Sequence, residues 1–111
     1  MPKVLLIDRD AVHAERVSRR LQYHSLEVVT CADPQQAILV LRRTSGEYDV
    51  VIINVSDQTL PWVSMLVKLQ EACFLSNGYP SPMFLCTSTV SRSPEFQLQI
   101  ERRGARYVVA R

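Results

Sequence analysis

Five short apolar runs alternate along the chain with longer stretches that have helical patterns, and this alternation limits the possible folds more than any other feature. The run at residues 50–53 has no polar interruption, and the run at residues 26–31, which contains Glu27 and Thr30, is rich in β-branched residues. Short apolar runs without regular alternation are typical of strands buried on both faces. A chain with elements in this order is predicted to form a parallel sheet with helices on both faces. The runs occupy residues 3–7, 26–31, 50–53, 83–87 and 107–110.

Four stretches between these runs are predicted to be helices. Residues 11–22 have an apolar stripe with polar flanks. The pairs Asp33-Pro34 and Ser93-Pro94 each place a capping residue before a proline, which is a helix start. Pro61 starts the remaining helix, whose apolar face is broad enough to include an interaction surface beside its part in the core. The predicted order is therefore βαβαβαβαβ.

The composition fits one domain, residues 1–111, of ordinary globular type. Hydrophobic residues make up 47% of the chain and charged residues 22%. No apolar run approaches the roughly 18 residues of a membrane span, and the first run is too short for a signal peptide, so a cytoplasmic protein is expected. The net charge of +2 does not require a nucleic-acid partner.

The cysteines and histidines give no sign of a metal site or a disulfide framework. Cys31, Cys73 and Cys86 are widely separated and odd in number, so we interpret them as small buried apolar residues. His13 and His24 show no ligand spacing with any cysteine, and we interpret them as surface groups. No cofactor is predicted from these residues.

Polar residues follow the predicted strands at their carboxyl ends, where open α/β sheets form their functional crevice. These residues come from distant parts of the chain, and we expect them to converge in space. They are Asp8, Arg9 and Asp10 after the first strand, Asn54 after the third, Thr87 and Ser88 after the fourth, and Arg111 after the fifth.

Four segments in this order resemble the receiver domain of response regulators in bacterial two-component signalling. They are residues 3–10, 48–54, 82–87 and 104–111. The resemblance covers essentially the whole chain. It implies a flavodoxin-like (CheY-like), doubly wound, five-stranded parallel sheet of strand order 2-1-3-4-5. It also implies a signalling module, not an enzyme, in which a fifth helix normally follows the fifth strand; that helix is missing from this chain.

The chain departs from the family's pattern at the residues that carry its phosphoryl chemistry. Asn54 stands where the resemblance places the phosphorylated aspartate, and an amide is not a useful nucleophile. Arg9 stands at the second acidic position, the family's main Mg²⁺ ligand, and its charge is permanent. Only Asp8 of the acidic pair remains. We therefore expect weak or absent Mg²⁺ binding and no phosphorylation of residue 54.

Other positions of this degenerate phosphorylation pocket keep part of the family's pattern. Thr87 matches the switch hydroxyl, and Arg111 keeps the charge of the usual lysine. Asp10 and Asp57 are additional acids that could reach the pocket. The position of Asp10 favours a role as the N-cap of the first helix. Asp57 is either an acid of the pocket or a residue that stabilises a loop turn or caps a helix.

Arg9, Asp8 and Asn54 are expected to form a metal-free, hydrogen-bonded cluster. In this hypothesis Arg9 replaces the cation and holds the pocket in one state. An Arg–Asp pair at about 4 Å gains roughly 4 kcal/mol at an effective dielectric constant near 20, before desolvation is subtracted.

The sequence thus predicts a phosphorylation-independent regulatory module that acts through protein–protein contact. Its partners are expected to be proteins, a second copy of the chain included, and nucleic acid only through an output domain not present here. A link to a phosphorelay or to transcription rests on the resemblance alone.

The alternatives are an active receiver that uses another acidic residue, and a small-ligand-binding flavodoxin-like domain. A small-ligand-binding domain of this kind needs a phosphate-binding glycine motif, and the chain has none. An engineered Asn54 and a chain cut after Arg111 also stay open.

Overall fold

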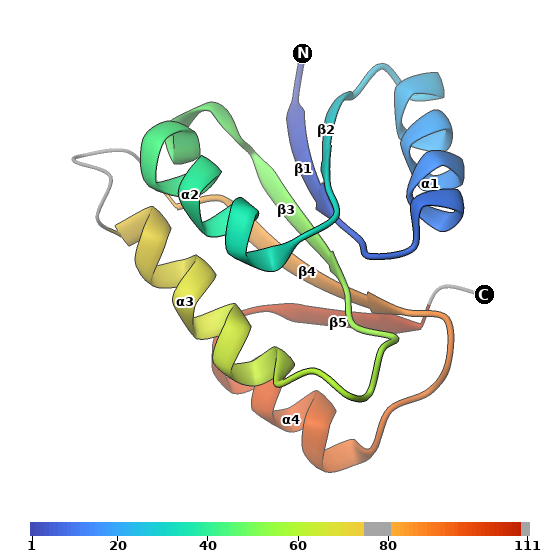
Figure 1. Ribbon diagram of the computed structural model, residues 1–111, viewed down its shortest axis with the longest axis vertical. Helices are drawn as coiled ribbons and strands as arrows, with labels where there is room; N and C mark the ends of the chain where they lie inside the picture. The colour runs from blue at the N-terminus through green and yellow to red at the C-terminus, as the bar shows by residue number, and fades with distance from the viewer. Residues whose placement is uncertain (75–80, 110–111) are drawn as a thin grey trace.

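The computed structural model describes residues 1–74 and 81–109, apart from the side chain of Ser45. Five parallel strands form one sheet of order β2-β1-β3-β4-β5 (Figure 1). The predicted strand order is confirmed. The strands are β1 (Lys3–Ile7), β2 (Glu27–Cys31), β3 (Val50–Asn54), β4 (Met83–Ser88) and β5 (Arg106–Val109).

Four α-helices connect the strands in the described part of the chain. Three of them, α2, α3 and α4, cover one face of the sheet, and α1 covers part of the other (Figure 1). No helix in the described residues is long and apolar enough to cross a membrane. The helices are α1 (Ala11–Tyr23), α2 (Pro34–Thr44), α3 (Trp62–Phe74) and α4 (Pro94–Arg102), with the short 3-10 helix η1 (Ser45–Glu47) after α2.

The strand side chains divide between two cores of unequal size. In β1, Leu5 and Ile7 pack into the larger cluster under α2, α3 and α4, whereas Val4 and Leu6 pack into the smaller cluster under α1. All four are at most 2% exposed. The continuous apolar run of β1 is therefore explained by burial on both faces.

The face under α1 is incompletely covered beyond β3. Met83 on β4 is 51% exposed and Val108 on β5 is 47% exposed, and no helix of the described residues covers them (Figure 1). Leu85, between them in the sheet, is only partly buried against the smaller cluster. In the described residues, this half of the sheet therefore leaves apolar side chains open to solvent, beside Thr87 and Arg106.

Capping side chains mark the beginning of α1 and α4, as predicted. Asp10 is the N-cap of α1, and its carboxylate accepts from the backbone N–H groups of Val12 and His13 at 3.1 Å each. Ser93 caps α4 by accepting from Phe96 N at 3.2 Å. The predicted cap role of Asp10 is confirmed. All three cysteines are buried and free, as predicted.

Candidate functional site

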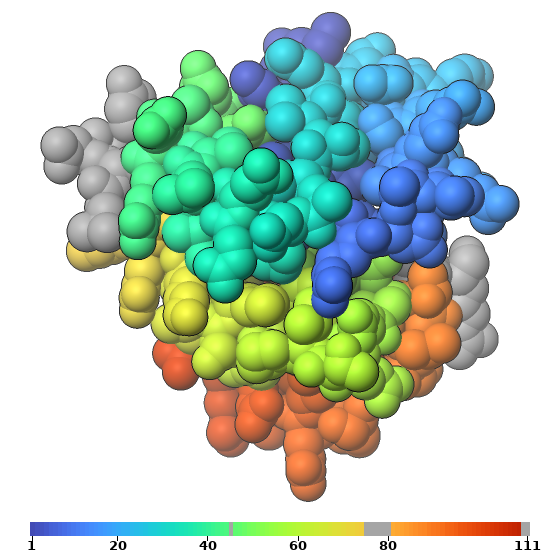
Figure 2. Space-filling view, in the orientation of Figure 1, coloured from blue at the N-terminus to red at the C-terminus, as the bar shows by residue number. Residues whose placement is uncertain are grey.

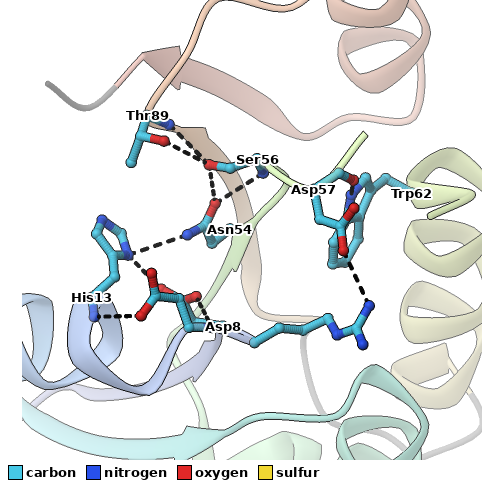
Figure 3. Close-up of a pocket in the computed structure, with 9 residues that line it drawn as sticks. Asp8, His13, Asn54, Ser56, Asp57, Trp62 and Thr89 are labelled. Carbon is cyan, nitrogen blue, oxygen red and sulfur yellow. Dashed lines mark hydrogen bonds and ion pairs between the residues drawn. The ribbon is translucent and has the colours of Figure 1, made fainter. Parts of the chain in front are cut away.

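A pocket of about 380 Å³ lies at the carboxyl ends of β1, β3 and β4 (Figure 3). At the surface, the segment after β1 (blue) lies against the segment that leads into α3 (yellow-green), as Figure 2 shows. The pocket is lined by Asp8, Arg9, Asp10, His13, Asn54, Ser56, Asp57, Trp62 and Thr89.

Asp8 is the buried acid of this pocket. It directly follows β1 and is only 3% exposed. Its Oδ1 accepts from the backbone N–H of Asp10 at 2.9 Å, and its Oδ2 lies 2.5 Å from Nδ1 of His13. Both carboxylate oxygens thus have a partner within the first turn of α1 or just before it.

His13 joins Asp8 to Asn54 (Figure 3). It is the third residue of α1, and helical side chains tilt toward the N-terminus, which here faces the strand ends. Its Nδ1 lies 3.1 Å from Nδ2 of Asn54. The prediction that His13 is a surface group is wrong: its side chain is only 23% exposed, because the capped first turn directs it into the pocket.

Asn54 is the last residue of β3 and is 8% exposed. Its Oδ1 accepts from the backbone N–H of Ser56 at 2.9 Å and from the Ser56 hydroxyl at 2.5 Å. A backbone N–H can only donate, so Ser56 determines which end of the amide is the oxygen. The amide nitrogen must then face His13.

The hydroxyls of Ser56 and Thr89 lie beside Asn54. The backbone N–H of Thr89 donates to Ser56 Oγ at 3.0 Å, and the two hydroxyl oxygens lie 3.2 Å apart. Thr87 is the β4 neighbour of Asn54 in the sheet register, but it does not line the pocket. Ser88 is buried, and its hydroxyl donates to Val90 O at 2.5 Å, which is a loop-stabilising contact.

Arg9 contacts Asp57 instead of Asp8. Its Nη1 lies 3.2 Å from Asp57 Oδ2, and the two side chains are 51% and 39% exposed. The expected Arg9–Asp8 pair is therefore wrong. Both residues follow the end of β1: Asp8 contacts His13 of α1, whereas Arg9, which lies in a bend, contacts the segment before α3. The positive charge still lines the pocket, but at its rim.

Asp57 is fixed by its own loop. The Thr59 hydroxyl donates to Asp57 Oδ1 at 2.6 Å and the Thr59 N–H at 3.0 Å, and these bonds, with a smaller contribution from Arg9, lower the pKa of Asp57. The indole Nε1 of Trp62 donates to the Asp57 carbonyl at 2.6 Å. The loop before α3 is thus anchored to the buried start of that helix.

The structure brings together five of the residues predicted from the sequence. Asp8, Arg9, Asp10, Asn54 and Asp57 line one pocket, with Asp10 acting as a helix cap. Thr87 lies nearby in the sheet, and Arg111 lies outside the described residues.

Four lining residues were not predicted as members of the pocket: His13, Ser56, Trp62 and Thr89. A signal for His13 was present in the sequence. Once Asp10 is the N-cap, the third helical position faces the end of the preceding strand. Among the described residues, no group of three His, Cys, Asp or Glu side chains is arranged to hold a metal ion.

Comparison with known proteins gives structural matches only. No protein-family model matches the chain, and no curated protein matches it. The chemotaxis protein CheY4 of Vibrio cholerae is 26% identical with a TM-score of 0.74, over 98% of this chain and 86% of that one. The receiver domain of the Francisella response regulator 1452 is 22% identical with a TM-score of 0.76, over 98% and 84%.

Two further matches define what this similarity shows. CheY of Borrelia burgdorferi, solved in a complex with CheX, BeF₃ and Mg²⁺, is 15% identical with a TM-score of 0.80, over 99% of this chain and 78% of that one. A de novo designed Rossmann 2x3 protein is 18% identical with a TM-score of 0.69, over 100% and 79%. Similarity of fold alone does not establish function. The chain has the fold of the response-regulator receiver domains.

Proposed function

We propose that this chain is a receiver-type signalling module that acts through protein contacts without phosphorylation of residue 54. The observation that carries the proposal is the hydrogen bonding of Asn54 at the end of β3. Its oxygen accepts two hydrogen bonds from Ser56, and its nitrogen faces His13. A neutral amide held in this way offers phosphorus no anionic nucleophile.

The residues of the pocket do not fit a Mg²⁺ ion. This ion requires near-octahedral oxygen ligands and is usually held by carboxylates, waters and phosphate. Among the described residues, Asp8 is the carboxylate that His13 joins to Asn54, and its oxygens already contact Asp10 N and His13 Nδ1. The guanidinium of Arg9 adds a positive charge at the rim. We therefore propose that the pocket keeps one conformation without metal.

Protein partners follow from the same proposal. CheY of Borrelia burgdorferi, which shares the fold, was solved in a complex with CheX. In our proposal the chain presents one constant surface to its partner or to a second copy of itself. A cytoplasmic location, and any effect on transcription through an attached output domain, belong to this proposal as well.

Binding of Mg²⁺ with beryllofluoride tests the proposal. We expect no saturable shift of the Asp8, Arg9 or Asn54 amide signals when both are titrated into the ¹⁵N-labelled chain. A matched control is the double variant Arg9→Asp/Asn54→Asp, which restores the two missing carboxylates and is expected to gain Mg²⁺ binding. Tight, saturable binding by the unmodified chain would overturn the proposal.

Asp57 supports a second candidate, an active receiver with a displaced acceptor. Its carboxylate lines the same pocket and is 39% exposed. Acetyl phosphate followed by intact mass separates the two candidates. A phosphoryl adduct that disappears in Asp57→Asn and persists in Asp10→Asn would establish the second candidate in place of the first.

A further inference from the structure

We infer that Asn54 is a site of hydrolytic deamidation, catalysed by its own pocket. The reaction would turn the amide into a carboxylate and release ammonia. Three features of the site point to it: two donors on the amide oxygen, an acid group at the amide nitrogen, and an open cavity beside both (Figure 3).

The amide oxygen lies in a cradle of hydrogen-bond donors. Ser56 provides its backbone N–H at 2.9 Å and its hydroxyl at 2.5 Å. The Thr89 N–H donates to that hydroxyl oxygen at 3.0 Å and so orients it. When water adds to Cγ, negative charge develops on this oxygen, and donors already in place stabilise it.

The amide nitrogen lies next to a proton source. His13 Nδ1 is 3.1 Å from Asn54 Nδ2 and 2.5 Å from Asp8 Oδ2. The imidazole and the buried carboxylate can share one proton, and the same Nδ1 reaches the atom that must be protonated to leave as ammonia. This places an acid at the leaving group.

The present hydrogen bonds at Nδ1 also favour the product. A proton on Nδ1 satisfies Asp8 but leaves the Asn54 NH₂ group, which can only donate, without an acceptor there. A lone pair on Nδ1 accepts from Asn54 but opposes ionised Asp8. A carboxylate at residue 54 would accept from Nδ1–H and remove the conflict. Hydrolysis therefore exchanges a mismatched contact for a matched one.

The step is balanced with water as the single co-reactant. The water oxygen bonds to Cγ, and the electron pair of the carbonyl moves onto Oδ1. As that pair returns, the Cγ–Nδ2 bond breaks and the nitrogen takes the proton held between His13 and Asp8. The added water gives one proton back to that pair. The carboxylic acid that results passes its remaining proton to the ammonia, so the products are a carboxylate and ammonium. The cavity of about 380 Å³ beside Asn54 has room for the water.

The ordinary route of asparagine deamidation is obstructed at this residue. That route needs the next backbone nitrogen to attack Cγ and form a succinimide, which opens mainly to isoaspartate. Here the next nitrogen is Val55 N, which donates to Thr87 O at 2.7 Å. Direct hydrolysis gives normal aspartate alone, so the product reports the route.

The consequence of this reaction rests on the proposed function, in which residue 54 holds the acceptor position without a carboxylate. Deamidation would supply that carboxylate. The hydrolysis itself is measured on the peptide that contains residue 54 and needs no phosphoryl donor. Failure of the hydrolysis and failure of the proposed function are therefore separate results.

The test is incubation of the whole folded chain in heavy-oxygen water, followed by tryptic peptide mass spectrometry. Lys68 separates the peptide of Asn54 from that of Asn77, the other asparagine of the sequence. We expect one heavy oxygen in normal aspartate at residue 54. We expect His13→Gln and Ser56→Ala to slow the conversion at least about tenfold.

Matched controls are His24→Gln and Ser64→Ala, which change exposed residues outside the pocket and are expected to leave the rate unchanged. The rate at residue 54 is also measured in the unmodified chain unfolded in urea. Because the pocket exists only in the folded chain, we expect faster conversion in the folded than in the unfolded chain, and this comparison holds even if a variant does not fold. Isoaspartate at residue 54, an equal or faster rate in urea, or no conversion while Asn77 reacts would each overturn the inference.

Discussion

His13 is the residue that organises the pocket. Its ring lies between the buried acid that follows β1 and the amide that ends β3, at 2.5 Å from Asp8 and 3.1 Å from Asn54. An imidazole can thus connect the two strand ends without a metal ion. Arg9, which we expected in this role, instead forms an exposed ion pair with Asp57.

The titration of Asp57 is a prediction at this scale. Its pKa should lie below the ordinary value of 3.8, and Thr59→Val should raise it more than Arg9→Gln does, because the Thr59 hydrogen bonds are the largest cause of the shift. A lowered pKa stabilises the fold above the ordinary value, and this stabilisation is lost as the pH falls through the folded value.

Carboxyl-carbon NMR of the two variants and the unmodified chain measures this titration. The control is the carboxyl-carbon signal of Glu95, which lies on α4 outside the pocket and which neither substitution should change. A larger rise in Arg9→Gln than in Thr59→Val would show that the ion pair, and not the loop, dominates at Asp57.

The identities of the key pocket residues were more predictable than their contacts. Position after a strand was enough to select Asp8, Arg9 and Asn54. The partner of Arg9 was not predictable, because the direction of a side chain after a strand depends on the turn that follows. His13 was missed because helical periodicity alone does not say which helical positions face the strand ends.

At the scale of elements, the N-terminus of α1 positions the pocket. Asp10 ends the turn after β1 and accepts from two N–H groups of the first helical turn. Its own backbone N–H donates to Asp8 at 2.9 Å. One residue therefore determines where α1 begins and helps to hold the buried carboxylate beside His13.

Removal of this cap should destabilise the chain. We expect Asp10→Ala to lower the free energy of unfolding by about 1 kcal/mol, because two N–H groups lose their acceptor. Asp10→Ser keeps a capping oxygen and should recover most of the loss. Urea denaturation of the three proteins measures both effects. Equal losses in the Ala and Ser variants would contradict the capping account.

At the scale of the whole molecule, the two faces of the sheet are covered unequally. Three helices bury the larger core, whereas α1 leaves the β4–β5 half of the other face open in the described residues. The alternation of apolar runs was enough to predict a parallel sheet between layers of helices, since parallel strands need crossover helices. The strand order was predicted from the resemblance to receiver domains, not from this pattern. How much of each face is buried depends on where the helices lie, and the pattern of apolar residues does not predict their positions.

This asymmetry predicts different costs for two leucine truncations. Leu66 on α3 is 1% exposed, so Leu66→Ala should lower the free energy of unfolding by about 3 kcal/mol. Leu85 lies on the open face, so Leu85→Ala should cost about 1 kcal/mol or less. Urea denaturation at several protein concentrations compares them. Equal losses that depend on concentration would mean that a second copy covers the open face.

The central claim is that Asn54, in this pocket, keeps the chain from accepting a phosphoryl group. The most direct measurement is intact mass after incubation of the freshly purified chain, verified as asparagine at residue 54, with acetyl phosphate and Mg²⁺. The double variant Arg9→Asp/Asn54→Asp serves as the positive comparison. We predict an adduct on the double variant that hydroxylamine removes, and none on the unmodified chain. A comparable adduct on the unmodified chain would contradict the account.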